Sequence, residues 1–187
     1  PVRDSHAPPS SPLCTTDVRT SAKPFAAIAR ACAVELQAQD RLTILRSAGP
    51  GAGWTGKLWA MQQGFKEANN RAPKYLLFTD ADIVYEPGAL ARLVSEAEAK
   101  SLVLNSLMVK LRCESFAERM LIPAFIFFFQ MLYPFAWANR PAAATAAAAG
   151  GCMLARRDAL HAAGGIEGIR GALIDDCALA ASLKRQG

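Results

Sequence analysis

The sequence predicts an α/β fold in which crossover helices join the strands of a mostly parallel sheet. Short apolar runs such as "RLTILRS" and "KYLLFTD" alternate with helical patterns such as "KLWAMQQGFKEANN". Two carboxylates follow one of these runs directly, at the strand end where such sheets bind ligands. The 187 residues, 52% of them hydrophobic, suffice for one buried core.

The elements follow in a regular order. Residues 1–23 are rich in Pro, Ser and Thr and show no clear period, which predicts an irregular segment. From Pro24 to Asp40 apolar residues recur at helical spacing, and a strand, a helix over 57–70 and a buried strand ending before Asp80 come next. A helix beginning at Pro87 and the strand-like "SLVLNSLMV" complete this part.

An apolar segment then interrupts the alternation. Ser115 and Glu118 have the spacing of a capping box, and the chain is apolar from Met120 to Ala138 except for two prolines and one glutamine. A membrane-spanning helix needs about 20 apolar residues, and these interruptions disfavour a simple span. A buried core helix is one interpretation. Because Phe residues occur on all sides, we expect instead a helix that contacts the membrane interface.

The last third returns to the α/β pattern. "GGCMLARRDALHAAGGI" predicts a strand and a short helix that ends at Gly164 and Gly165. "LIDDCALAASLK" places Asp175 and Asp176 at the start of a further helix. Acidic residues are favoured there by the helix dipole, so helix capping and a catalytic role are both open.

The charge and the cysteines exclude some classes of function. The net charge of +5 favours a partner with phosphate groups, either a nucleotide or anionic lipid. The basic residues are scattered without interleaved aromatic residues, so we expect no nucleic-acid partner. The five cysteines are widely spaced, which suggests neither a zinc site nor a disulfide framework.

Asp80-Ala81-Asp82 is the strongest candidate for chemistry. The alternation of an extended chain points both carboxylates to the same side, where they can hold a hard divalent cation that in turn binds a diphosphate. Asp176 is a candidate general base for an acceptor hydroxyl. Together these groups predict group transfer from a nucleotide-diphospho donor.

A phosphate-binding loop is the alternative. Gly51-x4-Gly56-Lys57 follows a strand-like run, and Asp80 could contact Mg²⁺ in a nucleoside triphosphatase. Leu58 stands where Ser or Thr would bind the metal, and Trp54 is bulky for a loop that must wrap phosphate closely. Thr79 also interrupts the apolar run just before Asp80. These three departures make the nucleoside triphosphatase the weaker interpretation.

The ordered motifs "YLLFTDADIVYEPGAL", "GGCMLARRDAL" and "IDDCALAASLK" resemble family 2 glycosyltransferases of the GT-A fold. The resemblance covers roughly Phe25 to Gly187. The segment Trp54-x-Gly56-Lys57-x-Trp59, together with "IPAFIFFFQMLYPF", is similar to the hopanoid-associated membrane branch of that family.

The resemblance implies roles on the donor side. Asp80 would lie near the nucleotide ribose, and Asp82 would bind Mg²⁺ or Mn²⁺ on the diphosphate of a nucleotide-sugar, expected to be UDP-linked. Lys57 matches the family's Gly-Lys near the nucleotide. Asp17 is offset by one residue from an acidic residue of the family that helps to hold the nucleotide base.

It also implies roles on the acceptor side. Asp176 would be the general base of a single inverting displacement, and Asp175 occupies the place of the usual Glu. Gly150 and Gly151 match the small residues before the acceptor-side strand.

The motifs and the resemblance together predict a glycosyltransferase that uses a lipid-like acceptor, such as a hopanoid, at the cytosolic face of a bacterial inner membrane. Residues 1–23 resemble the family's first strand only as a remnant, with Arg3 and Asp4 in register, and the family's Gln-x-x-Arg-Trp is not found after the acidic pair. We therefore expect a partial GT-A domain over 24–187, with the membrane-interface helix at about 115–138. An inactive membrane-bound relic is a further alternative.

Overall fold

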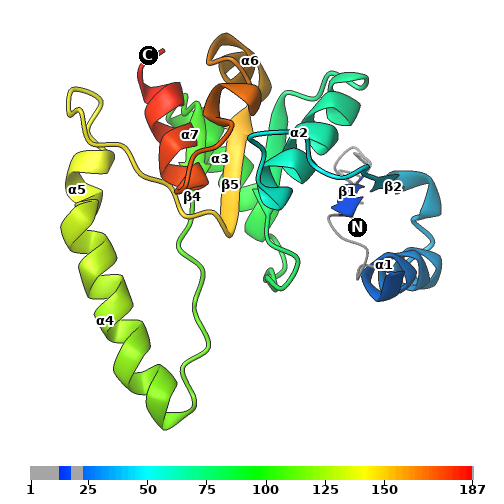
Figure 1. Ribbon diagram of the computed structural model, residues 1–187, viewed down its shortest axis with the longest axis horizontal. Helices are drawn as coiled ribbons and strands as arrows, with labels where there is room; N and C mark the ends of the chain where they lie inside the picture. Colours follow the sequence, from blue (N-terminus) through cyan, green and yellow to red (C-terminus); the bar gives the residue numbers. More distant parts are fainter. Residues whose placement is uncertain (1–12, 18–22, 187) are drawn as a thin grey trace, which may run out of the picture. The chain divides into compact units, whose positions relative to one another are not determined.

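The computed structural model describes residues 13–17 and 23–186, and the chain divides into two compact units, residues 1–71 and 72–187 (Figure 1). Each unit is described by itself. The first contains β1 (Leu13–Asp17), α1 (Lys23–Glu35), a 3₁₀ turn (Gln39–Arg41), β2 (Leu42–Arg46) and α2 (Gly56–Asn69). The second contains β3 (Tyr75–Thr79), α3 (Ala89–Ala99), β4 (Leu104–Ser106), α4 (Phe116–Leu132), α5 (Phe135–Ala138), β5 (Cys152–Arg156), α6 (Arg157–Ala162), a 3₁₀ turn (Glu167–Ile169) and α7 (Asp175–Lys184).

The first unit holds a parallel strand pair. β1 pairs with β2 in a register that sets Leu13 opposite Leu42, and α1 is the crossover between them. The prediction of an irregular segment is wrong for β1, because pairing with a strand more than 20 residues away supplies hydrogen bonds that local composition does not reveal. α1 ends at Glu35 rather than near Asp40, since the chain turns at Gln37 with φ of 51°.

The second unit holds a three-stranded sheet in the order β3-β5-β4. β5 is antiparallel to both neighbours, with Thr79 opposite Cys152 and Leu104 opposite Ala155. The expectation of a mostly parallel sheet is therefore wrong here. β3 and β4 do run in the same direction, as a crossover through α3 requires, but β5 enters between them from the α4–α5 segment in the opposite direction.

β5 is the buried strand of this sheet. Cys152 and Leu154 pack against Leu93 and Ala97 of α3, and the alternate residues Met153 and Ala155 are completely buried too. β3, which we expected to be buried, is only half-buried. Its carboxyl end therefore lies beside a well-packed strand, and this arrangement positions the candidate site.

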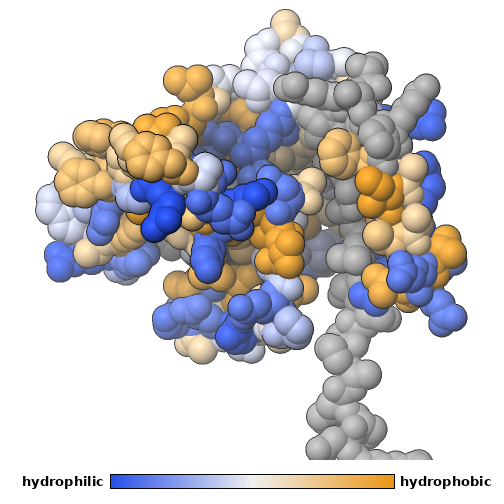
Figure 2. All heavy atoms as spheres, turned by 90° about the horizontal axis from the view of Figure 1, so that it is seen from below, coloured by the Kyte–Doolittle hydropathy of each residue, from blue (hydrophilic) through white to orange (hydrophobic). Residues whose placement is uncertain are grey.

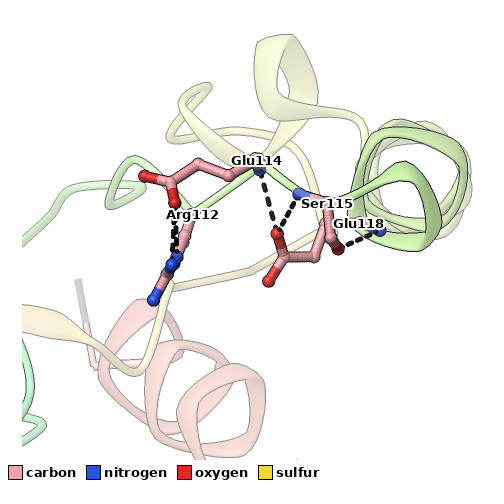
Figure 3. Close-up of polar contacts among 4 residues, drawn as sticks. All are labelled: Arg112, Glu114, Ser115 and Glu118. Carbon is pink, nitrogen blue, oxygen red and sulfur yellow. Dashed lines mark hydrogen bonds and ion pairs between the residues drawn. The ribbon is translucent and has the colours of Figure 1, made fainter.

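α4 begins with the predicted capping box (Figure 3). Ser115 Oγ accepts the N–H of Glu118 at 3.2 Å, and the Glu118 carboxylate accepts the N–H groups of Ser115 and Glu114 at 2.8 and 2.9 Å. These backbone hydrogen bonds hold the pKa of Glu118 below its usual value. Arg112 pairs with Glu114 at 2.7 Å beside the box.

α4 has no buried residue, so a buried core helix is the wrong interpretation of this segment. Its hydrophobic side chains gather at the left of Figure 2, where α4 also lies in Figure 1. The helix continues through Pro123 and ends before Pro134, after which α5 begins. Within residues 13–17 and 23–186, no helix has the length and apolar content needed to cross a membrane.

Candidate active site

The predicted acidic motif lies in the loop that leaves β3. β3 ends at Thr79, and the N–H of Asp80 donates to the carbonyl oxygen of Gly151 at 3.4 Å, just before β5. The Asp80 and Asp82 residues are both exposed. Because β3 and β5 are antiparallel, the end of the first strand meets the start of the second, and the loop carrying the two carboxylates lies beside Gly150 and Gly151.

Asp176 is held from two directions in the first turn of α7. Its Oδ2 accepts the N–H of Gly150 at 2.9 Å, and its Oδ1 accepts the N–H of Cys177 at 2.8 Å. The residue is half-buried. Each carboxylate oxygen can accept more than one hydrogen bond, so an acceptor hydroxyl could still donate to Asp176.

The segment Gly150–Gly151 thus joins the two predicted groups. One glycine accepts from the backbone of Asp80, and the other donates to Asp176. A Cβ on Gly151 would lie 3.3 Å from Val109 Cγ2, so close packing favours glycine at this position. The structure therefore brings together four residues that the sequence separates by almost 100 positions.

Sequence reasoning missed Thr79 and Tyr85. The Tyr85 hydroxyl donates to Thr79 Oγ1 at 2.7 Å, and the Thr79 hydroxyl lies 3.1 Å from the carbonyl oxygens of Gly151 and Asp80. Burial raises the pKa of the Tyr85 phenol, so it remains a donor at neutral pH. Thr79 was noted only as an interruption of an apolar run, and no spacing rule links it to Tyr85.

The acidic loop fits a cation that is shared with a bound diphosphate. In the described part of the chain, no three His, Cys, Asp or Glu residues form a metal cluster. Mg²⁺ is commonly bound by one or two carboxylates together with substrate phosphates rather than by protein alone. Asp80 and Asp82 can supply such carboxylates, and no protein group within the described ranges hydrogen-bonds or pairs with the side chain of Asp82.

The glycine-lysine loop belongs to the first unit. Thr55 caps α2 by accepting the N–H of Leu58 at 3.2 Å, and Lys57 is exposed in the first helical turn. Trp59 Nε1 donates to the carbonyl oxygen of Ala48 at 3.0 Å, and its ring meets that of Trp54 edge to face at 5.3 Å. Leu58 is fully buried and serves the core, so it could not turn toward a phosphate-bound metal.

Two further predicted residues have defined backbone positions. Asp17 is the last residue of β1, opposite Arg46 of β2. Asp175 is half-buried and begins α7, directly before Asp176. Arg3 and Asp4, the remnant of a first strand, lie outside the described residues.

A cavity of about 720 Å³ lies in the second unit, lined by β4, the α4–α5 junction, α7 and the segment before Gly150. Its apolar lining includes Phe129, Phe135 and the alanines at 146–149. Lys184 closes one side, since its Nζ donates to the carbonyl oxygens of Thr145 at 2.7 Å and Ala138 at 2.9 Å. The lining thus includes the end of the apolar helix and Ala149, the residue directly before Gly150.

The chain matches the family described as Glycosyl transferase family 2 over residues 35–164. Searches of curated proteins and of solved structures give no match. The family match includes the glycine-lysine loop, the acidic loop after β3 and the Gly150–Gly151 segment, and it sets aside the nucleoside triphosphatase reading. The chain belongs to the family 2 glycosyltransferases, enzymes that use nucleotide-sugar donors.

Proposed function

We propose that this glycosyltransferase moves a sugar from a UDP-linked donor to a lipid-like acceptor, such as a hopanoid, at the cytosolic face of a bacterial inner membrane. The reaction is metal-dependent and inverts the anomeric centre. The observation that carries the proposal is the Gly150–Gly151 segment, which contacts Asp80 on one side and Asp176 on the other.

The chemistry is a single displacement. Asp176 takes the proton of the acceptor hydroxyl, whose oxygen forms a bond to the anomeric carbon while the bond from that carbon to the diphosphate oxygen breaks. A divalent cation bound by Asp82, with Asp80 beside it, would neutralise the charge of the departing diphosphate. The two backbone N–H groups at Asp176 orient its carboxylate for proton removal.

The donor-side residues of the first unit are part of the proposal. Lys57 is exposed in the first turn of α2, where a positive side chain and helix N–H groups can meet a phosphate. Asp17 is proposed to contact the nucleotide base from the end of β1.

The apolar surface of α4 supports a membrane contact. At about 100° per residue, its large exposed apolar side chains cover roughly half of the helix circumference, and no charged residue falls within that half. These residues are Phe116, Met120, Leu121, Phe125, Phe127, Phe128, Met131 and Leu132. Arg119 and Gln130 lie on the other side. A helix of this kind suits the boundary between lipid headgroups and acyl chains.

The cavity supports a lipid-like acceptor. Its apolar lining begins with Phe129 and Phe135 at the end of the exposed helix and continues along the alanines that precede Gly150. An acceptor with a hydrocarbon body in this cavity could present its hydroxyl group toward Asp176.

Two variants test the reaction. Asp82→Asn should abolish calorimetric binding of UDP in the presence of MnCl₂, because it removes the charge that holds the cation. Asp176→Asn should bind UDP and Mn²⁺ as wild type does, while the release of UDP from UDP-sugars falls about 10²- to 10⁴-fold, the usual size of general-base catalysis. Retained turnover in Asp176→Asn would exclude it as the base.

A third variant tests the membrane contact. Phe128→Asp places a charge in the exposed apolar half of α4 and should abolish co-sedimentation with vesicles of anionic and zwitterionic lipid. Gln130→Asp places the same charge outside that exposed apolar half of the same helix and serves as the control. Equal binding of both variants would contradict an interfacial role for α4.

A further inference from the structure

Two hydroxyl groups close the loop that carries Asp80 and Asp82. Thr79 is the last residue of β3, and Tyr85 follows Asp82 by three positions. The Tyr85 hydroxyl donates to Thr79 Oγ1 at 2.7 Å, and Thr79 in turn lies 3.1 Å from the carbonyl oxygen of Gly151. The start and the end of the acidic loop are thereby tied to each other and to the strand opposite.

The backbone–backbone hydrogen bonds of this loop are long. The N–H of Asp80 lies 3.4 Å from the Gly151 carbonyl oxygen, and the N–H of Ile83 lies 3.5 Å from that of Asp80. Both exceed the usual length of a protein hydrogen bond. The short Tyr85–Thr79 bond is therefore the strongest polar restraint on the loop among the described residues.

Tyr85 connects this restraint to the hydrophobic core. Its half-buried side chain packs against the cluster that contains Leu93, Ala97, Cys152 and Leu154. The ring position is fixed by that packing, so the hydroxyl presents a defined donor to Thr79. The relay from Tyr85 through Thr79 reaches Gly151, and the neighbouring Gly150 donates its N–H to Asp176.

We propose that Tyr85, acting through Thr79, is a positioning residue of the transferase that fixes the Asp82 loop relative to Asp176. The proposal rests on the proposed function of the same site. Tyr85 touches neither substrate nor cation; its hydroxyl keeps the loop in the conformation in which Asp82 meets the diphosphate-bound cation.

The test compares Tyr85, in the loop that follows β3, with Tyr75, the first residue of β3. Tyr85→Phe removes one hydroxyl and keeps the ring, and Tyr75→Phe makes the same change at the opposite end of the strand, in contact with the same core. Mn²⁺ binding in the presence of UDP is measured by electron paramagnetic resonance. Tyr85→Phe should weaken it about fivefold, the effect of one hydrogen bond, whereas Tyr75→Phe should match wild type.

Further readouts separate positioning from a general loss of structure. Hydrogen exchange of the amides at 80–85 should quicken in Tyr85→Phe while exchange in β5 stays unchanged. Thr79→Val should weaken Mn²⁺ binding as Tyr85→Phe does, whereas Thr79→Ser, which keeps the hydroxyl, should bind Mn²⁺ with wild-type affinity. The double variant of Tyr85→Phe and Thr79→Val should bind Mn²⁺ no more weakly than the weaker-binding single variant.

The outcomes distinguish this proposal from the reaction itself. If Asp82→Asn loses Mn²⁺ and UDP but Tyr85→Phe binds as wild type with unchanged exchange, the relay does not position the loop and only this proposal fails. If Asp82→Asn binds normally, the site is misassigned and both proposals fail. Additive effects of Tyr85→Phe and Thr79→Val would also overturn the relay.

Discussion

Gly151→Ala should separate close packing from catalysis in the candidate site. A Cβ at this position would lie 3.3 and 3.5 Å from the two methyl groups of Val109 and 3.6 Å from Ile83 Cδ1. Only the shortest of these contacts is too close, so the neighbours must move by a few tenths of an ångström. Overpacking of this kind costs about 1–3 kcal/mol, and we expect a value near the lower end.

Replacing a glycine whose backbone conformation suits alanine also raises the free energy of unfolding by about 0.4–1 kcal/mol, because it restricts the unfolded chain; neither Gly49 nor Gly151 has a positive φ. Gly49→Ala measures this contribution alone, because a Cβ there has no atom within 4 Å. Urea unfolding should therefore show Gly151→Ala to be less stable than Gly49→Ala by about 1–2 kcal/mol. Turnover should fall as well, because the Gly151 carbonyl oxygen accepts from both Asp80 and Thr79.

A double-mutant cycle tests whether Val109 is the group that opposes a Cβ at position 151. Val109→Ala removes the methyl groups that the new Cβ would meet, so Gly151→Ala should behave like Gly49→Ala in that background, with a coupling energy of about 1 kcal/mol. Turnover should recover in parallel. A coupling energy of zero would show that Val109 is not the obstacle, and full turnover in Gly151→Ala alone would show that this segment does not position the catalytic groups.

Lys184→Met should lower the free energy of unfolding by about 2 kcal/mol, because Nζ donates to three carbonyl oxygens, while exposed Arg185→Met should match wild type in urea unfolding. Ser115→Ala should destabilise the start of α4 by about 1 kcal/mol, seen as faster amide exchange in its first turn; unchanged exchange would contradict the capping box. The folded pKa of Glu118 is lowered, so its stabilisation of this turn is complete above the ordinary value of 4.5 and is lost as the pH falls through the folded pKa; exchange rates independent of pH, after correction for intrinsic chemistry, would refute this. Lys57→Met should weaken UDP-sugar binding, because it removes the positive charge proposed to meet the donor phosphate; unchanged affinity in calorimetry would remove Lys57 from the donor site.

The sequence was most informative where a local rule decides the structure. The capping box at Ser115, the helix stop at Gly164 and the acidic start of α7 all follow from the preferences of single turns. The position of Asp80 after a strand follows from an apolar run of four residues, Tyr75 to Phe78. These features need no knowledge of the rest of the chain.

The sequence was a poor guide where contacts between distant segments determine the structure. The insertion of β5 between β3 and β4 depends on how the chain returns after α4 and α5, and no periodicity records the direction of a strand. The strand β1 exists through its pairing with β2. Tyr85 was missed for the same reason, because its hydrogen bond depends on how the acidic loop folds back.

The local contacts of the two acidic residues support the division of roles between them. Both oxygens of Asp176 already face backbone N–H groups, whose positive ends would repel a cation brought close to that carboxylate. The exposed Asp82 has no such donors within the described ranges, so a cation and its phosphate ligands can approach it. A base, by contrast, needs a fixed orientation toward one proton, which two backbone donors provide. The reverse assignment, with Asp82 as base and Asp176 as metal ligand, would place each group in the surroundings least suited to its role.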